Sequence, residues 1–274
     1  MTNAEREFSL AYLTVSGCTP EEMTYIASQA GYDYVSFRFI TMNVPGEINF
    51  NIIQSKQLLK NTQIAMKNTG IKLLDIELAR IDEYNDPKEY EAAAELGGKH
   101  IISSIWTNNY DLYIERFAHV CDLAKQYGLT VELEFVPIAS VTKLEEVVQI
   151  LNTVKKDNAG ILIDIYHFHR AGHHPEELAE LPKEWFRFIH LCDAPAEIPD
   201  NHEEMIRIIR EARSYIGEGG IDIKSIINVL PNVPLSIELP NATYVRKYGY
   251  LEHARRALTS AKKYLQEDIS IYRE

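Results

Sequence analysis

The chain has 274 residues, with 28 lysines and arginines against 40 aspartates and glutamates, so its formal net charge is −12. Proteins that bind nucleic acids normally gather lysine and arginine against phosphates, and this acidic balance argues against such a partner. The hydrophobic share of 46% and the charged share of 25% are typical of a globular protein and exclude a disordered or fibrous one. No apolar run reaches the roughly 18 residues of a membrane span, and no basic segment precedes the first apolar stretch. We therefore expect a cytoplasmic protein with no membrane partner.

The three cysteines, Cys18, Cys121 and Cys192, lie far apart and form no CxxC pair. This pattern suggests neither a disulfide framework nor a cysteine zinc site, and we interpret them as reduced thiols. Glycine and proline are scattered singly, and no low-complexity linker divides the chain. We therefore expect one domain over residues 1–274.

Eight short segments rich in valine, isoleucine and phenylalanine alternate with longer segments of helical periodicity. We expect strands at residues 8–15, 34–40, 71–78, 100–106, 130–136, 160–166, 186–192 and 234–239. Helical segments carry start signals such as Thr19 before Pro20, and stop signals such as Gly128. This order predicts the α/β class and a (β/α)8 TIM barrel. A doubly wound open sheet is the alternative, but no GxGxxG loop follows the first predicted strand.

Polar residues near the carboxyl ends of these strands are candidates for an active site, because TIM barrels bind substrate at that end. The two-residue period turns Glu132 and Glu134 inward in the fifth strand and Asp164 inward in the sixth. The same period turns His190 and Glu238 inward in the seventh and eighth. Carboxylates inside a barrel are costly unless they are paired or bind metal. Carboxylates with an imidazole suit Mn(II), Mg(II), Co(II) or Zn(II).

At these positions the chain resembles the sugar phosphate isomerase/epimerase superfamily, whose members share the xylose isomerase-like TIM barrel. The resemblance extends over nearly the whole chain in strand order. The matching motifs are Glu134 in LEFVP, Asp164 and His167 in DIYH, His190 in FIHLCDA, Glu238 in SIELPN, and Arg213 ahead of Gly217-Glu218-Gly219.

The resemblance implies one divalent metal ion, Mn(II) above Mg(II), Co(II) or Zn(II), held by Glu134, Asp164, His190 and Glu238. It implies that His167 and Arg213 contact the substrate and that the two glutamates are catalytic. The implied activity is isomerisation or epimerisation of a small sugar, sugar phosphate or keto-polyol through a metal-stabilised enediolate. The same motifs occur in inosose and 3-dehydroshikimate dehydratases, so a dehydratase is the alternative. The family also makes a homodimer possible.

Two further inward residues are candidates for substrate binding. Glu77 shares its inward parity with Asp75, and Arg38 could bind a phosphate or carboxylate through two hydrogen bonds. For Arg38, an ion pair with Glu77 or Asp75 is the alternative.

Two other function classes fit the sequence less well. A barrel of the endonuclease IV type uses a larger zinc cluster and a basic DNA-facing surface, against which the net charge counts. A non-catalytic sugar-binding barrel would be expected to lack one of the four metal positions, and none is missing.

Overall fold

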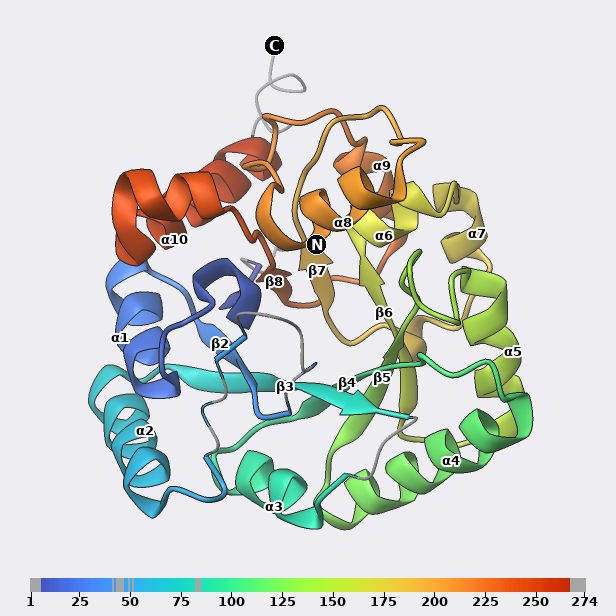
Figure 1. The fold of residues 1–274 in the computed structure, drawn as a ribbon, viewed down its shortest axis with the longest axis horizontal. Coiled ribbons are helices and arrows are strands. Elements are labelled where there is room, and N and C mark those ends of the chain that lie inside the picture. Colours follow the sequence, from blue (N-terminus) through green and yellow to red (C-terminus); the bar gives the residue numbers. More distant parts are fainter. Residues whose placement is uncertain are drawn as a thin grey trace.

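The computed structural model describes residues 6–40, 42, 47–48, 50, 52–81 and 85–266. Eight parallel strands form a closed barrel in chain order, and the last strand pairs with the first. Helices surround this ring on the outside (Figure 1). The predicted (β/α)8 barrel is therefore confirmed. None of the described helices combines the length and hydropathy needed to cross a membrane.

The strands have the following bounds: β1 (Phe8–Leu10), β2 (Tyr34–Arg38), β3 (Lys72–Arg80), β4 (His100–Ser104), β5 (Thr130–Glu134), β6 (Ala159–Asp164), β7 (Ile189–Leu191) and β8 (Leu235–Ile237). The α-helices are α1 (Pro20–Ala30), α2 (Lys56–Thr69), α3 (Pro87–Glu95), α4 (Tyr110–Gln126), α5 (Leu144–Val154), α6 (Ile165–Arg170), α7 (Pro175–Ala179), α8 (His202–Glu211), α9 (Ile223–Val229) and α10 (Ala242–Gln266). Two 3-10 helices, η1 (Tyr12–Val15) and η2 (Lys183–Trp185), complete the described elements.

Helix boundaries follow the signals in the sequence. Thr19 caps α1 by accepting a hydrogen bond from the Glu22 amide, and the Glu22 carboxylate accepts the Thr19 amide in return. At the other end of a helix, α4 stops at Gln126, and Gly128 takes the left-handed φ of 73° that favours glycine. These local rules fix where the helices begin and end around the barrel.

Several strands are shorter than expected at the carboxyl end. The segment predicted as a strand over residues 8–15 leaves the barrel after Leu10, and its second half is η1. The segment predicted over 160–166 ends at Asp164, because the Asp164 side chain accepts the His167 amide at 3.0 Å and caps α6. The segment predicted over 234–239 ends at Ile237, so Glu238 directly follows β8 rather than lying in it.

The amino-terminal half of the barrel interior holds a buried ion pair. Arg187 donates from Nη1 to both carboxylate oxygens of Glu132 at 3.0 Å, and the Thr130 hydroxyl donates to the same carboxylate at 2.7 Å. Gly160 stands opposite Glu132 in the β5–β6 register, and a Cβ there would overlap this ion pair. The inward Glu132 is thus a paired structural carboxylate.

A second polar layer lies between β1, β2, β3 and β8. The Ser36 hydroxyl donates a short hydrogen bond to Asp75 and lies 3.0 Å from the Ser9 hydroxyl and 3.4 Å from that of Ser236. All four side chains are buried. Buried polar side chains linked by hydrogen bonds therefore fill this part of the barrel interior, although Asp75 Oδ2 has no hydrogen-bond partner among the described residues.

Candidate active site

A cavity of about 500 Å³ opens at the carboxyl ends of the strands, the end where TIM barrels carry their active sites. Of the predicted site residues, all but Asp164 line this cavity. Asp164 is fully buried at the end of β6, within 3.9 Å of the His190 ring. The structure therefore brings the predicted residues together around one space.

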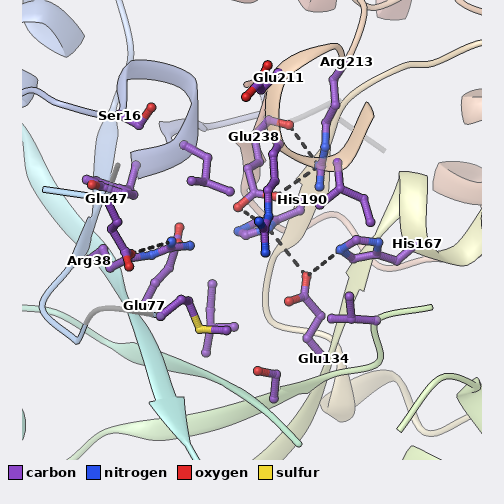
Figure 2. A pocket seen from close by; sticks show the side chains of 18 of the residues that line it. Ser16, Arg38, Glu47, Glu77, Glu134, His167, His190, Glu211, Arg213 and Glu238 are labelled. Carbon is purple, nitrogen blue, oxygen red and sulfur yellow. Dashed lines mark hydrogen bonds and ion pairs between the residues drawn. The ribbon is translucent and has the colours of Figure 1, made fainter. Parts of the chain in front are cut away.

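His190 stands at the centre of this group (Figure 2). Its Nδ1 lies 3.5 Å from Glu238 Oε1, 3.9 Å from Asp164 Oδ2 and 4.0 Å from Glu134 Oε1. Both ring nitrogens are buried, and within the described part of the chain neither has a hydrogen-bond partner. A buried imidazole with unused nitrogens, facing three carboxylates, matches the mixed oxygen and nitrogen donor set of a divalent metal site.

Arg213 neutralises part of this negative charge. Its Nη1 lies 2.6 Å from Asp164 Oδ2 and 3.0 Å from Glu238 Oε2, and it donates to the Glu238 carbonyl at 3.1 Å. The side chain is 1% exposed, and its guanidinium lies 5.3 Å from the centre of the Tyr166 ring. Arg213 therefore bridges two of the predicted ligands.

The loop after Arg213 is held in place by Asp193. The Asp193 carboxylate accepts amide hydrogen bonds from Gly217, Gly219, Gly220 and Ile221 at 2.9–3.2 Å. The Ser214 amide also donates to the Asp193 carbonyl at 2.8 Å. Asp193 thus anchors the glycine loop through its carboxylate and the segment that presents Arg213 through its backbone carbonyl.

The pKa values of the two glutamates are displaced in opposite directions. Burial, reinforced by Glu238, raises the pKa of Glu134 well above its ordinary value. Burial would raise the pKa of Glu238 too, but His190 and Arg213 outweigh it and hold that pKa below the usual range. The carboxylates around His190 overcome its burial and raise its pKa to about 10. Strong mutual perturbation in a cleft is typical of a functional site.

His167 completes the wall beside Glu134. It sits in the first turn of α6, and its Nε2 lies 4.0 Å from Glu134 Oε1. Burial lowers the pKa of His167 to about 4, so the ring is neutral at physiological pH. A neutral ring can donate or accept a hydrogen bond at the cavity surface.

Arg38 and Glu77 form the opposite wall of the cavity (Figure 2). Arg38 donates to Glu77 Oε2 from Nη2 at 2.6 Å and from Nε at 3.1 Å, and from Nη1 to Glu47 at 3.2 Å. The guanidinium also stacks over the Tyr12 ring at 5.0 Å. The ion pair with Glu77, one of the two alternatives for Arg38, is therefore present, and Glu47 adds a second carboxylate.

Sequence reasoning missed several lining residues that come from outside the strands. Glu47 and Tyr12 both line the cavity, and both interact with Arg38. Tyr12 falls in the segment expected to be strand, and Glu47 falls beyond the end of β2. No period or motif marks either residue, because their positions depend on how the chain leaves each strand.

Known proteins are similar to this chain in sequence and in structure. A curated relative, the inosose isomerase of Bacillus subtilis (strain 168), is 29% identical over 161 residues, which are 58% of this chain and 55% of that protein. The chain thus matches only about half the length of this relative. A crystal structure of the IOLI protein with a bound zinc atom has a TM-score of 0.78 at 21% identity, covering 96% of this chain and 99% of that one.

A D-allulose 3-epimerase from Methylomonas sp., crystallised with D-allulose, has a TM-score of 0.67 at 16% identity over 95% of this chain and 98% of that one. At such identities the two solved structures establish the fold alone. The model of the xylose isomerase-like TIM barrel family matches residues 25–267. Because this match covers most of the chain, including every predicted metal ligand, the protein belongs to the family of xylose isomerase-like TIM barrels.

Proposed function

We propose that the protein is a divalent-metal-dependent isomerase or epimerase of a small keto-polyol. The observation that carries this proposal is the convergence of Glu134, Asp164 and Glu238 on His190, whose two buried ring nitrogens have no partner among the described residues. Family membership and the inosose isomerase name of the Bacillus subtilis relative support an enzyme that acts on sugars.

The donor set fits a divalent ion. The ligand atoms of Glu134, Asp164 and His190 lie within 4.8 Å of one another, and Glu238 faces the same ring nitrogen of His190. A divalent ion bound here would polarise a substrate carbonyl and so acidify the neighbouring C–H group. Mn(II) is our first candidate, and Zn(II), Mg(II) and Co(II) are the comparison ions.

The side chains themselves supply the proton transfers. Glu134 and Glu238 approach His190 from different strands, so their carboxyl groups flank a substrate placed in the cavity. One carboxylate accepts the proton from the carbon beside the carbonyl, and the other returns a proton to the neighbouring carbon or to the opposite face. His167 and Arg213 would donate hydrogen bonds to substrate oxygens and fix its orientation.

The charges that line the cavity favour an uncharged substrate. Arg38 is paired with Glu77 and Glu47, and Arg213 is paired with Asp164 and Glu238. Each buried guanidinium thus already faces two carboxylates, and a phosphate or carboxylate on the substrate would have to displace one of them. We therefore place neutral ketoses and cyclitol ketones ahead of sugar phosphates and 3-dehydroshikimate.

Proton NMR in D2O tests this function. Protein loaded with Mn(II) is incubated with neutral ketoses and inososes, and with phosphorylated or carboxylated analogues. We expect deuterium to enter the neutral substrates beside the carbonyl, and the exchange rate to fall about 10²–10⁴-fold in Glu134→Gln, as loss of a general base does. The surface change Glu204→Gln is the control and should leave the rate unchanged.

The outcomes separate the alternatives. Label retained in an isomer or epimer of the substrate supports the proposal, whereas loss of a hydroxyl identifies a dehydratase. Exchange that is unaffected by Glu134→Gln, or that needs no divalent ion, contradicts the assigned residues. Faster exchange of the phosphorylated analogues contradicts the charge argument alone.

A further inference from the structure

Glu238 lies just past the end of a strand, where the barrel ladder no longer holds the backbone. β8 ends at Ile237, and its neighbour β1 ends at Leu10, the residue paired with Ile237 in the β1–β8 register. The Glu238 amide still donates to the Leu191 carbonyl on β7 at 3.1 Å. On the β1 side, the Ala11 amide donates to the Ile237 carbonyl at 3.2 Å, and the chain then turns into η1 instead of continuing as a strand beside Glu238 and Leu239.

The Thr14 side chain, on η1, adds a second bond to the Ile237 carbonyl and extends the backbone pairing to Leu239. Its hydroxyl donates to the Ile237 carbonyl at 2.7 Å and accepts the Leu239 amide at 2.8 Å. Thr14 is 1% exposed, and both hydrogen bonds are buried. One hydroxyl therefore binds the residue before Glu238 and the residue after it.

The carbonyl of Leu239 is fixed separately. His253 on α10 places Nε2 3.1 Å from this oxygen, while its Nδ1 lies 3.0 Å from the Tyr215 hydroxyl. Leu239 is thus held at its amide by Thr14 and at its carbonyl by a buried histidine. Buried hydrogen bonds therefore hold the backbone on both sides of Glu238.

From this arrangement we infer that Thr14 is a positioning residue for Glu238. Its hydroxyl continues the β8 ladder by one step and thereby sets the height and direction at which the Glu238 carboxylate faces His190. This inference rests on the proposed function, in which Glu238 binds the metal ion and transfers a proton. The valine side chain has the shape of threonine but lacks the hydroxyl, so Thr14→Val would leave the buried Leu239 amide without its acceptor.

The test compares three variants of the full chain: Thr14→Val, Thr14→Ser and Thr24→Val. Thr14→Ser keeps the hydroxyl. Thr24→Val is the matched control, because Thr24 is equally buried and its hydroxyl donates at 2.7 Å to the Pro20 carbonyl within α1, away from the site. Thermal unfolding of all three shows whether each variant is folded and how far its stability changes.

The first readout is the affinity for Mn(II) by isothermal titration calorimetry. We expect Thr14→Val to weaken binding about 10-fold or more, the scale on which residues that orient metal ligands act. The Mn(II) affinities of Thr14→Ser and Thr24→Val should stay within about 3-fold of the wild-type affinity. The second readout is the exchange reaction in D2O, where kcat should fall in Thr14→Val with little change in KM, because the substrate contacts remain.

Equal Mn(II) affinity and equal kcat in Thr14→Val and the wild type would overturn the inference while leaving the proposed function in place. An equal loss in Thr24→Val would also overturn it, since general destabilisation would then explain the effect. A wild type that binds no divalent ion and exchanges no substrate would instead reject the proposed function, and the inference with it.

Discussion

Replacing Arg187 with methionine isolates the energetic role of the buried ion pair at the base of the barrel. The Glu132 side chain is 1% exposed, and Arg187 is its bidentate partner at 3.0 Å. Methionine keeps much of the apolar stem of arginine and removes the charge. Glu132 then stays buried without its guanidinium, and removing one member of a buried ion pair typically costs about 3–5 kcal/mol.

The loss of stability in Arg187→Met should depend on pH, because the buried carboxyl group of Glu132 becomes neutral when it binds a proton. Burial raises the pKa of Glu132 from 4.5 to about 7, despite the opposing effect of Arg187. Because this pKa is already about 7 with Arg187 present, protonating Glu132 in the folded protein costs only about 1–2 kcal/mol at pH 8 and nothing at pH 5. Protonation therefore limits the electrostatic loss in Arg187→Met to about 1–2 kcal/mol at pH 8, below the cost of a carboxylate that stays charged, and no such loss is expected at pH 5.

The stability of the wild type should itself fall as the pH rises from 5 to 8. Because the pKa of Glu132 is raised in the folded state, that state binds more protons than the unfolded chain between pH 4.5 and about 7. This contribution is fully present below pH 4.5 and is lost as the pH rises through about 7. Burial lowers the pKa of the neighbouring His100 to about 3, so His100 does not titrate in this window.

Urea unfolding at pH 5 and pH 8, followed by circular dichroism, measures these differences. The double variant Glu132→Gln/Arg187→Met removes both charges and should recover most of the stability lost at pH 8. A loss of equal size at both pH values, or no recovery in the double variant, would refute the view that an unpaired buried carboxylate causes the effect.

Three further predictions concern the interior, the metal site and the glycine loop. Gly160→Ala should lower the free energy of unfolding in urea by about 3 kcal/mol or more, because its Cβ would overlap the buried ion pair and lie 2.7 Å from the Trp185 carbonyl. Unchanged stability would contradict the placement of Gly160 opposite Glu132. A divalent ion at 100 times its Kd should stabilise the protein by about 2.7 kcal/mol, seen as a higher thermal midpoint that EDTA reverses; a shift that persists in His190→Ala would place the ion elsewhere. Asp193→Asn should cost about 1–3 kcal/mol, since an amide nitrogen would face amide donors of the loop; unchanged thermal unfolding would show that the loop is held by other contacts.

The barrel and the inward-facing residues could be predicted because they depend on local periodicity. Alternation along the fifth, sixth and seventh predicted strands places Glu134, Asp164 and His190 on the inner face, and the structure brings them within 4.8 Å of one another. Alternation in the eighth predicted strand added Glu238, and the resemblance of the motifs added His167 and Arg213; all three line the cavity. A two-residue period requires no knowledge of the partner strands, so a single sequence is enough to apply it.

The exact strand ends could not be predicted, because hydrogen bonds between side chains and the backbone decide them, and a two-residue period does not show these bonds. Asp164 terminates β6 by capping α6, and Thr14 bonds to the backbone on both sides of Glu238, 223 and 225 residues away in sequence. The role of Arg38 was equally open, since Glu47, with which it forms an ion pair, lies outside any helix or strand. The Thr14 and Arg38 contacts join residues that come close only after the chain has folded, whereas the Asp164 cap is local.

The alternation of side chains along a strand shows which residues face into the barrel, but not how close each one lies to the cavity at the carboxyl end. That position separates structural carboxylates from functional ones. Glu132 and Glu134 share one face of β5, but Glu132 is paired with Gly160 in the β5–β6 register and lies beside Arg187, while Glu134 reaches the cavity. Two residues along a strand amount to about 7 Å, enough to move a carboxylate from a closed ion pair to the substrate space. A glycine in register with an inward glutamate therefore indicates room for a buried partner, whereas a glutamate at the last strand position remains free for chemistry.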